Sequence, residues 1–449
     1  MKKRTLAIVL SLIMCFAVVA YGCTPAETTP SDDSSAAPSE STEQGTEPSE
    51  STESGDSTEG DATTGDIYSL LPDLALSGIT NPDMADRADV EKAWPKTPAS
   101  EDTIVIGWTE INQASDWFVG VKEGAEARAE ELGFQLQFLV AEDDPQTQSQ
   151  HIDTFISQGV DIIVVDPVNS SAPVNDINRA VEAGIPVVCI GTVPDDCQAL
   201  TTLTANPFLN GYECGKVIGA QYDANEDIIS TVIIGVMGSS TSESRVCGMM
   251  AGILEQRMEA KGSAYASQED AWMAGYEMFQ ALKTGGKAEN ADAGFYVNGF
   301  GVGDWTVEGG LTAAEDLITA NADMNLILAE NDFMAAGAYS ALETAGMVEQ
   351  VKIGAAADGT RVGLDMIKDG QLICTGPNNG NAQGAWAIDF INAIFNEGAD
   401  PSDLPLGAYF DSYAITADNV DDIYDANEVF FKVGEFEFPA SIPELKGEA

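Results

Sequence analysis

Short runs of aliphatic residues alternate with helix-like patterns of apolar positions from residue 103 onward. The runs predict a first set of buried strands at 104–106, 136–140, 162–165 and 187–190. An apolar period near 3.6 residues predicts helices between them at 118–132, 147–158 and 174–183. Continuous aliphatic strands joined by helical crossovers indicate a parallel sheet that is covered on both faces.

A second set of strand patterns follows the first and predicts a second sheet. Its strands are expected at 231–237, 295–297, 326–328 and 351–353. Two such sets in one chain predict an α/β fold with two similar, Rossmann-like lobes. Ligands of open α/β sheets bind beyond the carboxyl ends of the strands, so candidate site residues are expected in the loops after each strand.

The first residues of the chain have the pattern of an export signal. Three basic residues at 2–4 precede an apolar run at 6–19, which is too short for a membrane anchor and is followed by polar sequence. The sequence Ala-Tyr-Gly-Cys at 20–23 resembles a bacterial lipobox, which predicts a lipoprotein signal peptide at 1–22 and lipidation of Cys23. The alternative is an ordinary signal peptide with an incidental cysteine. In the first case, the protein is held by its lipid at the outer face of the cytoplasmic membrane.

The next segment has the composition of an unfolded linker. Residues 24–66 include 12 acidic residues, no Lys or Arg, and no aromatic or large aliphatic residue. Such a stretch cannot bury enough apolar surface to offset its chain entropy, so a disordered acidic tether is predicted at 23–66. Apolar residues return at 67–100, which we interpret as a lead-in segment that packs on the body of the protein.

The charge of the chain limits its partners. The 73 acidic and 20 basic residues give a formal net charge of −53, which repels phosphate and excludes a nucleic-acid-binding function. The chain contains a single His, which argues against His-based catalysis and against a multi-His metal site. A hydrophobic content of 44% is sufficient for a globular core.

Motifs for nucleotides, metals and catalysis are incomplete. The glycines at 299–303 lack the spacing of a dinucleotide loop, and 211–216 is one residue short of a phosphate loop. The D-x-N-x-D spacing at 223–227 is that of a calcium loop, but Ile228 replaces the required Gly, so a polar turn is the preferred interpretation. His151 lies within a predicted helix and is expected at the surface. We therefore predict no cofactor, no metal and no catalytic residue.

The cysteines beyond Cys23 are odd in number, so a complete disulfide framework is impossible. These cysteines are Cys189, Cys197, Cys214, Cys247 and Cys374. Cys189 lies in a predicted strand and is expected to be a buried apolar residue. A bridge between Cys197 and Cys214 remains possible from the spacing.

Several loop motifs, taken in order, resemble a known protein family. They are Trp-Phe-Val-Gly-Val-Lys-Glu-Gly-Ala at 117–125, Asp-Pro at 166–167, Ala-Gly-Ile-Pro-Val at 183–187, Arg-Val-Cys-Gly at 245–248, Ala-Glu-Asn-Asp at 329–332 and Ala-Asp-Gly-Thr at 357–360. Over about 102–408, the chain resembles the type I periplasmic sugar-binding proteins of the ribose-binding kind. The individual motifs are short, but their order and spacing are specific.

The resemblance implies two lobes joined by a hinge that the chain crosses three times, near Ala205, Asn378 and Ala408. Lobe 1 would comprise 101–205 and 379–408, and lobe 2 would comprise 206–378 and 409–449. The segment 262–303 is longer than usual for the family and is interpreted as an insertion that packs on lobe 2. Its centre, 269–282, has the pattern of an amphipathic helix.

The resemblance also implies a sugar site between the lobes. Trp117 and Phe118 match the aromatic pair that stacks on one face of the sugar, and Trp305 matches the aromatic residue on the other face. The matching polar contacts are Arg245, Asn331, Asp358 and Asn378, the last at a position where the family often has Gln. Aromatic faces suit the C–H faces of a sugar ring, and planar polar groups suit its hydroxyl edge. Each residue alone could instead be a core residue, a helix cap or an ion-pair partner.

The chain departs from the family after the strand at 187–190. Gly191 and Thr192 stand where ribose-type proteins carry an Asp-Arg pair, which puts ribose itself in doubt. Ser115 and Thr192 are predicted to contribute to the site. Asn112, Asp195 and Asp196 are further candidates for the missing contact.

The resulting functional prediction is an exported, lipid-anchored and monomeric solute-binding protein. It would capture a small neutral sugar or polyol and deliver it to an ABC permease. A first alternative is a receptor of the same fold that reports its ligand to a membrane signalling protein. A second alternative is an enzyme on an α/β scaffold, which the incomplete catalytic motifs disfavour.

Overall fold

The computed structural model describes residues 66–71, 73–81, 87, 90–92, 94 and 103–447. The predicted signal peptide at 1–22, the predicted lipidation site Cys23 and all but the last residue of the 23–66 tether lie outside the described residues. Among the helices of the described part, none combines the length and the apolar character needed to cross a bilayer.

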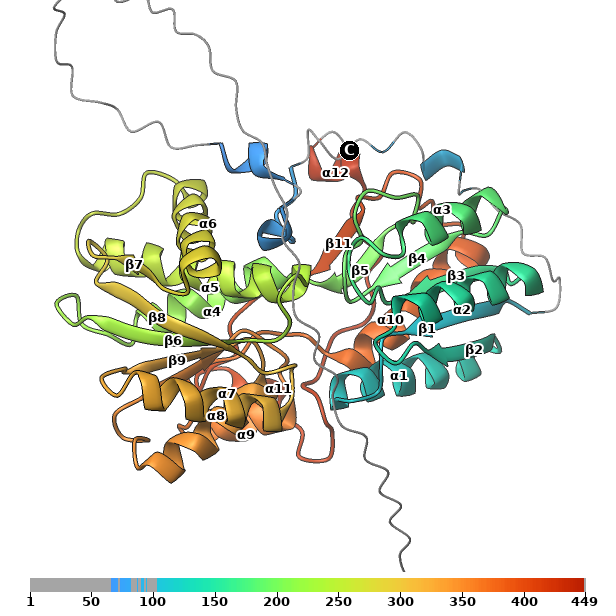
Figure 1. The fold of residues 1–449 in the computed structure, drawn as a ribbon. Helices are drawn as coiled ribbons and strands as arrows, with labels where there is room; N and C mark the ends of the chain where they lie inside the picture. The colour runs from blue at the N-terminus through green and yellow to red at the C-terminus, as the bar shows by residue number, and fades with distance from the viewer. Residues whose placement is uncertain are drawn as a thin grey trace, which may run out of the picture. The chain divides into compact units, whose positions relative to one another are not determined.

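Lobe 1 is built on a six-stranded sheet with the order β11-β5-β4-β3-β1-β2, in which all neighbouring strands are parallel. The strands are β1 (Val105–Glu110), β2 (Gln135–Val140), β3 (Ile162–Val165), β4 (Val187–Ile190), β5 (Thr202–Ala205) and β11 (Gly407–Phe410). Helices α1 (Asp116–Leu132) and α10 (Gly380–Asn392) pack together on one face, and α2 (Pro145–Gln158) and α3 (Val174–Glu182) cover the other (Figure 1). The residues of β3 and β4 are fully buried, as expected for strands covered on both faces.

Lobe 2 is built on a five-stranded sheet with the order β10-β9-β6-β8-β7. Its strands are β6 (Ile228–Ile234), β7 (Ala288–Asn290), β8 (Phe295–Val302), β9 (Leu326–Ala329) and β10 (Lys352–Ala355). One face carries α4 (Pro207–Gly219), α5 (Ser240–Ala260) and α6 (Gln268–Gly285), and the other carries α7 (Val307–Ala320), α8 (Asp332–Ala345) and α9 (Arg361–Lys368) (Figure 1). Short helical turns complete the described chain: η1 (Ile67–Leu70), η2 (Leu74–Leu76), η4 (Val90–Lys92), η5 (Ala393–Glu397), α11 (Val420–Ile423) and α12 (Ile442–Leu445).

The predicted fold class, an α/β protein with two Rossmann-like lobes, is confirmed. The second sheet is not purely parallel, however, because β7 pairs with β8 in the antiparallel direction. This edge strand has only three residues and no run of aliphatic side chains, so the sequence pattern did not predict it. The expected strand at 231–237 begins three residues earlier, at Ile228.

Close packing of α4 against α5 sets the position of Arg245. A Cβ atom at Gly211 of α4 would lie 2.2 Å from the carbonyl oxygen of Arg245, and one at Gly248 of α5 would lie 2.1 Å from the carbonyl oxygen of Phe208. Only glycine allows the two backbones to approach so closely. The glycine-containing segment 211–216, which resembled a phosphate loop, is therefore part of a helix–helix contact.

The chain passes between the lobes several times. It leaves lobe 1 after β5 and enters α4 of lobe 2, then returns to lobe 1 at α10 and contributes β11 to the first sheet. After β11, Ile415 pairs with Thr375 of lobe 2. Further along, Phe438 stacks on Phe390 of α10 with ring centroids 5.3 Å apart, so the C-terminal stretch contacts lobe 1 again.

The described residues between 66 and 94 contact both lobes. Ile67 is buried in the core of lobe 2, and the side-chain amide of Asn206 donates to the carbonyl oxygen of Gly78 over 2.8 Å. The Arg87 guanidinium donates to main-chain carbonyl groups of lobe 1, and Trp94 joins the core of that lobe. This N-terminal segment therefore packs across the junction of the lobes.

The amphipathic helix predicted at 269–282 is confirmed as α6. Its first turn is fixed by a capping box, in which the side chains of Ser267 and Asp270 accept from each other's main-chain N–H groups. Trp272 packs edge-on against Phe208 of α4, with ring centroids 5.5 Å apart. The apolar face of α6 is thus covered by the helices of lobe 2.

The loop at 223–227, which had the spacing of a calcium site, is occupied by an arginine. The fully buried guanidinium of Arg257 donates to the carbonyl oxygens of Tyr222, Asp223 and Glu226, and also to those of Ala224 and Ala293. Main-chain carbonyl groups of this loop are therefore turned toward a fixed cation, and the loop forms a turn, the interpretation preferred from the sequence.

Replacing Arg257 by Met should lower the free energy of unfolding by about 3 kcal/mol, because several buried carbonyl groups would lose their donor. The matched control is Arg179→Met, which removes only surface ion pairs to Asp153 and Asp176 and should cost less than about 1 kcal/mol. Urea unfolding of the three proteins measures both changes. Equal losses in the two variants would contradict the structural role of Arg257.

The five cysteines of the body are all free and buried. The bridge considered between Cys197 and Cys214 does not form, because Cys197 belongs to the core of lobe 1 and Cys214 to the core of lobe 2. Cys189 is fully buried in β4, as predicted for a small apolar residue of a core strand.

Candidate ligand-binding site

A cavity lies between the two lobes, at the carboxyl ends of their strands. Its empty volume is about 560 Å³, including the part that is open to solvent. All nine residues predicted to bind a ligand line this cavity: Ser115, Trp117, Phe118, Thr192, Arg245, Trp305, Asn331, Asp358 and Asn378. None of the residues of α6 lines it, so the insertion helix does not border this cavity.

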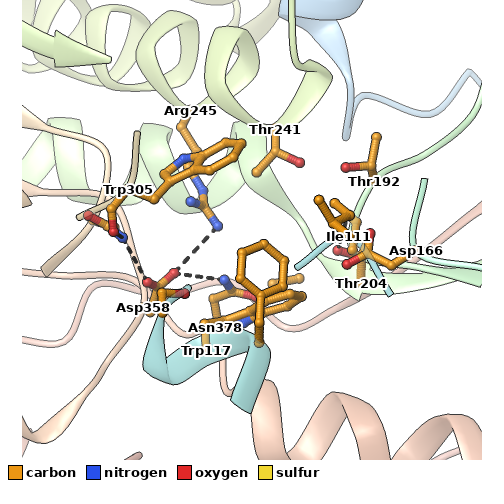
Figure 2. A pocket seen from close by; sticks show the side chains of 15 residues that line it. Ile111, Trp117, Asp166, Thr192, Thr204, Thr241, Arg245, Trp305, Asp358 and Asn378 are labelled. Carbon is orange, nitrogen blue, oxygen red and sulfur yellow. Dashed lines mark hydrogen bonds and ion pairs between the residues drawn. The ribbon is translucent and has the colours of Figure 1, made fainter. Parts of the chain in front are cut away.

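Lobe 1 contributes the start of α1 and the loop after β4. Ser115 is the N-cap residue of α1, and Trp117 and Phe118 lie in the first turn of that helix. The two aromatic rings meet edge to face, with centroids 5.1 Å apart and an interplanar angle of 84°. Thr192 follows β4 and is buried. It lies in the part of the cavity wall that lobe 1 forms, away from Trp117 (Figure 2).

Lobe 2 contributes Trp305, which follows β8 and adopts a positive φ of 55°. The indole N–H of Trp305 donates to Oε2 of the buried Glu330 over 3.0 Å. Gly235 leaves room for the indole, because a Cβ at this position would lie 2.0 Å from its nitrogen. The hydrogen bond to Glu330 and the close contact with Gly235 therefore fix the position of the indole. Trp305 lies on the opposite side of the cavity from Trp117 (Figure 2).

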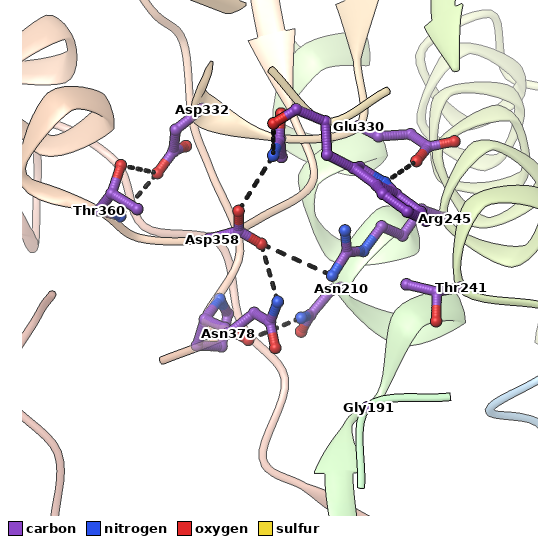
Figure 3. A network of polar contacts seen from close by, with 12 residues as sticks. Gly191, Asn210, Thr241, Arg245, Glu330, Asp332, Asp358, Thr360 and Asn378 are labelled. Atoms are coloured by element: carbon purple, nitrogen blue, oxygen red, sulfur yellow. Dashed lines mark hydrogen bonds and ion pairs between the residues drawn. The ribbon is translucent and has the colours of Figure 1, made fainter. Parts of the chain in front are cut away.

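Asp358 is the centre of a buried polar network (Figure 3). It accepts hydrogen bonds from the side-chain amides of Asn378, at 2.8 Å, and Asn331, at 3.2 Å. The guanidinium of Arg245 lies 3.7 Å from the same carboxylate. Burial raises the pKa of Asp358, and the charge of Arg245 and the two amides oppose this increase. The network thus holds a carboxylate and a guanidinium in fixed positions at the cavity.

Asn331 caps a helix and also lines the cavity. Its Oδ1 accepts from the main-chain N–H of Met334 and caps α8, while its Nδ2 donates to Asp358 and to the carbonyl oxygen of Trp305. The helix cap therefore orients the amide toward the cavity. The helix-cap interpretation is confirmed, and the predicted ligand contact of Asn331 stays a prediction.

Two further carboxyl groups are buried behind the cavity wall. Glu330 accepts from the hydroxyl of Ser242 over 2.8 Å as well as from Trp305, and burial raises its pKa to about 7. Asp332 accepts from the main-chain N–H and the hydroxyl of Thr360. Burial, together with the nearby charge of Asp358, raises the pKa of Asp332 to about 7.

The raised pKa of Asp332 should make folding stability depend on pH. A carboxyl with a pKa of about 4 in the unfolded chain and about 7 in the folded chain stabilises the fold below pH 4, and this contribution is lost as the pH rises through 7. The loss for one such group is about 4 kcal/mol at most. The Asp332→Asn variant lacks this titration, so its stability should fall less than that of the wild type between pH 4.5 and 7.5.

Urea unfolding at the two pH values tests this expectation. The control is Asp323→Asn, at an exposed position of the same lobe, which should keep the pH dependence of the wild type. If Asp332→Asn and the wild type lose the same free energy over this pH range, Asp332 does not titrate as described.

Sequence reasoning missed six residues that line the cavity: Ile111, Asp166, Gly191, Thr204, Ala205 and Thr241. Three of them, Ile111, Asp166 and Gly191, directly follow β1, β3 and β4, so the rule that sites lie beyond strand ends could have found them. Thr204 and Ala205 end β5, and Thr241 begins α5.

Three residues considered as replacements for the missing Asp-Arg pair do not line the cavity. The side-chain amide of Asn112 instead donates to Asp143 over 2.7 Å. Asp195 and Asp196 line a different surface cavity, next to the N-terminal segment. Within the described residues, no group of three or more His, Cys, Asp or Glu side chains is arranged to hold a metal ion.

Comparison with known proteins identifies the family. Residues 106–399 match the periplasmic binding protein domain. Ribose import binding protein RbsB of Escherichia coli (strain K12) is 24% identical over 311 residues, which cover 68% of this chain and 90% of that protein.

An ABC transporter solute binding protein from Bacillus halodurans, solved with bound myo-inositol, has a TM-score of 0.58 and 20% identity, covering 72% of this chain and 98% of that chain. Another, from Actinobacillus succinogenes with bound D-allose, has a TM-score of 0.57 and 22% identity, covering 71% of this chain and all of that chain (100%). Because the family match spans more than half of the sequence, the chain belongs to the type I periplasmic binding proteins.

Proposed function

We propose that this protein is an extracytoplasmic solute-binding protein that captures a sugar or sugar-like molecule for an ABC importer. The observation that carries the proposal is the convergence of all nine candidate residues on one cavity between the lobes. Aromatic rings from both lobes are available to cover the two faces of a ring-shaped ligand. Arg245 and the amides around Asp358 are available to its hydroxyl groups.

The comparisons support the same ligand class. The name of the E. coli relative refers to ribose import, and the two solved proteins contain myo-inositol and D-allose. All three molecules are small and rich in hydroxyl groups. The chain lacks the Asp-Arg pair that ribose-type proteins carry after β4, so we propose a related sugar or polyol rather than ribose.

Ligand binding would be coupled to closure of the lobes. Trp117, Phe118 and Thr192 belong to lobe 1, whereas Arg245, Trp305 and Asp358 belong to lobe 2. A ligand that contacts both sets binds the closed state more tightly than the open state and therefore shifts the population toward closure. The hinge would consist of the crossings near Ala205, Asn378 and Ala408, and the permease would recognise the closed form.

The N-terminal part of the chain would serve to deliver the ligand to the permease. A signal peptide at 1–22 would direct export, and a lipid on Cys23 would hold the protein at the membrane through the acidic segment 23–66. The protein would then act as a monomer next to its permease. A receptor that feeds a membrane signalling protein would have the same cavity and would differ only in its partner.

Binding, and not catalysis, is the proposed activity of the cavity. Asp358, the acidic residue of lobe 2 that lines the cavity, is held by two amides and a guanidinium, an arrangement that suits fixed hydrogen bonding. The relatives described above are named as binding proteins. Incubation with each candidate sugar, followed by analysis for new products, should show no turnover.

A thermal-shift screen tests the proposed function. The panel should contain monosaccharides, disaccharides, polyols, amino sugars, nucleosides and small furanones. A ligand that binds only the folded state stabilises it by about 2.7 kcal/mol at a concentration 100 times its dissociation constant. We expect at least one sugar or polyol to raise the melting temperature. A shift with another class, and with no sugar, would show that the ligand assignment is wrong.

A further inference from the structure

Two buried carboxyl groups lie side by side at the lobe 1 end of the cavity. Glu110 ends β1, and Asp166 directly follows β3, the strand paired with β1. Thr109 and Val165 are register partners, so the two acids occupy the next positions on adjacent parallel strands. Both side chains are fully buried. Asp166 lines the cavity (Figure 2), whereas Glu110 is not among the residues that line it.

The hydrogen bonds differ between the two acids. Glu110 accepts from the main-chain N–H of Ile111 at 3.1 Å and from the indole N–H of Trp108 at 3.2 Å, one donor to each oxygen. Two N–H donors favour the ionised form of Glu110. Neither oxygen of Asp166 has a hydrogen bond of good geometry, although the Glu110 carboxyl and the main-chain N–H of Thr192 lie beside it.

Ionisation of both carboxyl groups at once is unfavourable. Burial raises the pKa of both groups, and the charge of Glu110 raises the pKa of Asp166 further, well above its usual value. Two adjacent buried carboxylates cannot both be ionised at low cost. A pair that keeps one ionised carboxyl carries one negative charge at the cavity wall, where both oxygens of Asp166 are buried and have no hydrogen-bond partner.

That negative charge has no counter-ion in the described part of the chain. None of the ion pairs among the described residues includes Glu110 or Asp166. The guanidinium of Arg87 in the N-terminal segment donates to main-chain carbonyl groups, and Arg245 in lobe 2 faces Asp358. Burying an uncompensated charge is costly, which suggests that the missing partner arrives with the ligand.

The neighbouring loop supports an open approach to Asp166. Gly191 has a positive φ of 65°, and a Cβ at this position would lie 2.6 Å from Oδ1 of Asp166. The absence of a side chain at Gly191 therefore leaves room for the carboxyl group. It also removes the position at which ribose-type proteins place their acidic residue, so Asp166 is the acid that remains at this end.

We propose that the Glu110–Asp166 pair binds a protonated amine, and that the ligand is therefore an amino sugar or an amino polyol. This inference rests on the proposed sugar-binding function and specifies its substrate class. An ammonium N–H would donate to an oxygen of Asp166, and its positive charge would offset the negative charge of the pair. The Arg245–Asp358 end of the cavity would bind hydroxyl groups. The ligand then differs from the neutral one expected from the sequence.

Calorimetry with matched ligands tests the proposal at pH 6, where aliphatic amines are protonated. The pairs are D-glucosamine with D-glucose, D-galactosamine with D-galactose, and D-mannosamine with D-mannose. We expect the amine of at least one pair to bind at least tenfold more tightly than its hydroxyl counterpart. The N-acetyl derivative, which keeps the nitrogen but loses the charge, should lose this advantage without any change in the protein.

A double variant, Glu110→Gln with Asp166→Asn, removes the charge with little change of shape. It should bind the amine and the hydroxyl sugar with affinities within about threefold of each other. The single variant Asp166→Asn keeps the Glu110 carboxyl and should lose only part of the preference. Asp323→Asn, at an exposed position of lobe 2, is the control and should keep all of it. If the double variant does not fold, the comparison with N-acetyl derivatives in the wild type still shows whether the charge of the amine determines the affinity.

The outcomes separate the two proposals. Hydroxyl sugars that bind as tightly as their amines would overturn the amine assignment and leave the sugar-binding function intact. The amine assignment would also be wrong if the folded double variant keeps the preference for the amine. The same holds if the uncharged N-acetyl sugar binds as tightly as the amine. If the amines, the hydroxyl sugars and the rest of the thermal-shift panel all fail to bind, the proposed function itself is wrong.

Discussion

The Asp358→Ala variant should lose about 100-fold or more in affinity for the ligand that the thermal-shift screen identifies. Asp358 is buried, and its carboxylate holds the amides of Asn331 and Asn378 and faces Arg245 at 3.7 Å. Its removal leaves a buried guanidinium without a partner and frees both amides to rotate. Truncation of one member of a buried charge pair typically costs 2–5 kcal/mol of binding energy, about 30- to 5,000-fold. Isothermal titration calorimetry measures the loss.

Two controls separate a binding defect from unfolding. The Asp358→Asn variant keeps the shape and one acceptor oxygen, so its affinity should lie between those of the wild type and Asp358→Ala. The Asp323→Ala variant removes an exposed carboxylate of the same lobe and should bind as the wild type does. Circular dichroism should show all three variants folded. Wild-type affinity in folded Asp358→Ala would remove Asp358 from the site.

The Trp305→Ala variant should lose about 3 kcal/mol of binding energy, or roughly 100-fold in affinity, because buried aromatic anchors dominate such interfaces. Trp305 is the aromatic side chain that lobe 2 presents opposite Trp117, and its indole is held by Glu330. Loss of the indole would remove the side chain that is proposed to cover one face of the ligand ring. Calorimetry with the same ligand measures the change.

The Trp305→Phe variant is the matched control for this prediction. It keeps an aromatic face but cannot donate to Glu330, so its loss should be less than about tenfold. If Trp305→Phe loses as much affinity as Trp305→Ala, the effect belongs to the hydrogen bond with Glu330 and not to the aromatic face. Unchanged affinity in Trp305→Ala would show that the ligand does not stack on lobe 2.

The fold class and the edge of the sheet that carries the cavity could be predicted from the strand pattern, whereas the aromatic residues were named through the family resemblance. The strands at 162–165 and 187–190 are continuous aliphatic runs, which only a doubly covered parallel sheet explains. Residues that follow such strands, including Asp358, were expected at one edge of the sheet. The short polar strand β7 has no such signal, and its antiparallel pairing depends on contacts with β8.

Long-range polar contacts were beyond sequence reasoning. A polar turn was expected at 223–227, but the sequence could not show that carbonyl groups of this turn face Arg257, which is about 30 residues further along the chain. The pairing of Glu110 with Asp166 arises only when β1 and β3 become neighbours. Composition identifies the chain as acidic but does not reveal which carboxyl groups are buried together without a counter-ion.

A crystal structure of the protein with the tightest ligand of the panel tests the central claim most directly. The account predicts a ligand ring enclosed between Trp117 and Trp305, with ligand oxygens within hydrogen-bond distance of Arg245 and Asp358. Contacts from both lobes to one ligand molecule would establish the cavity as the binding site. A ligand bound outside this cavity, or one without any contact to lobe 2, would contradict the account.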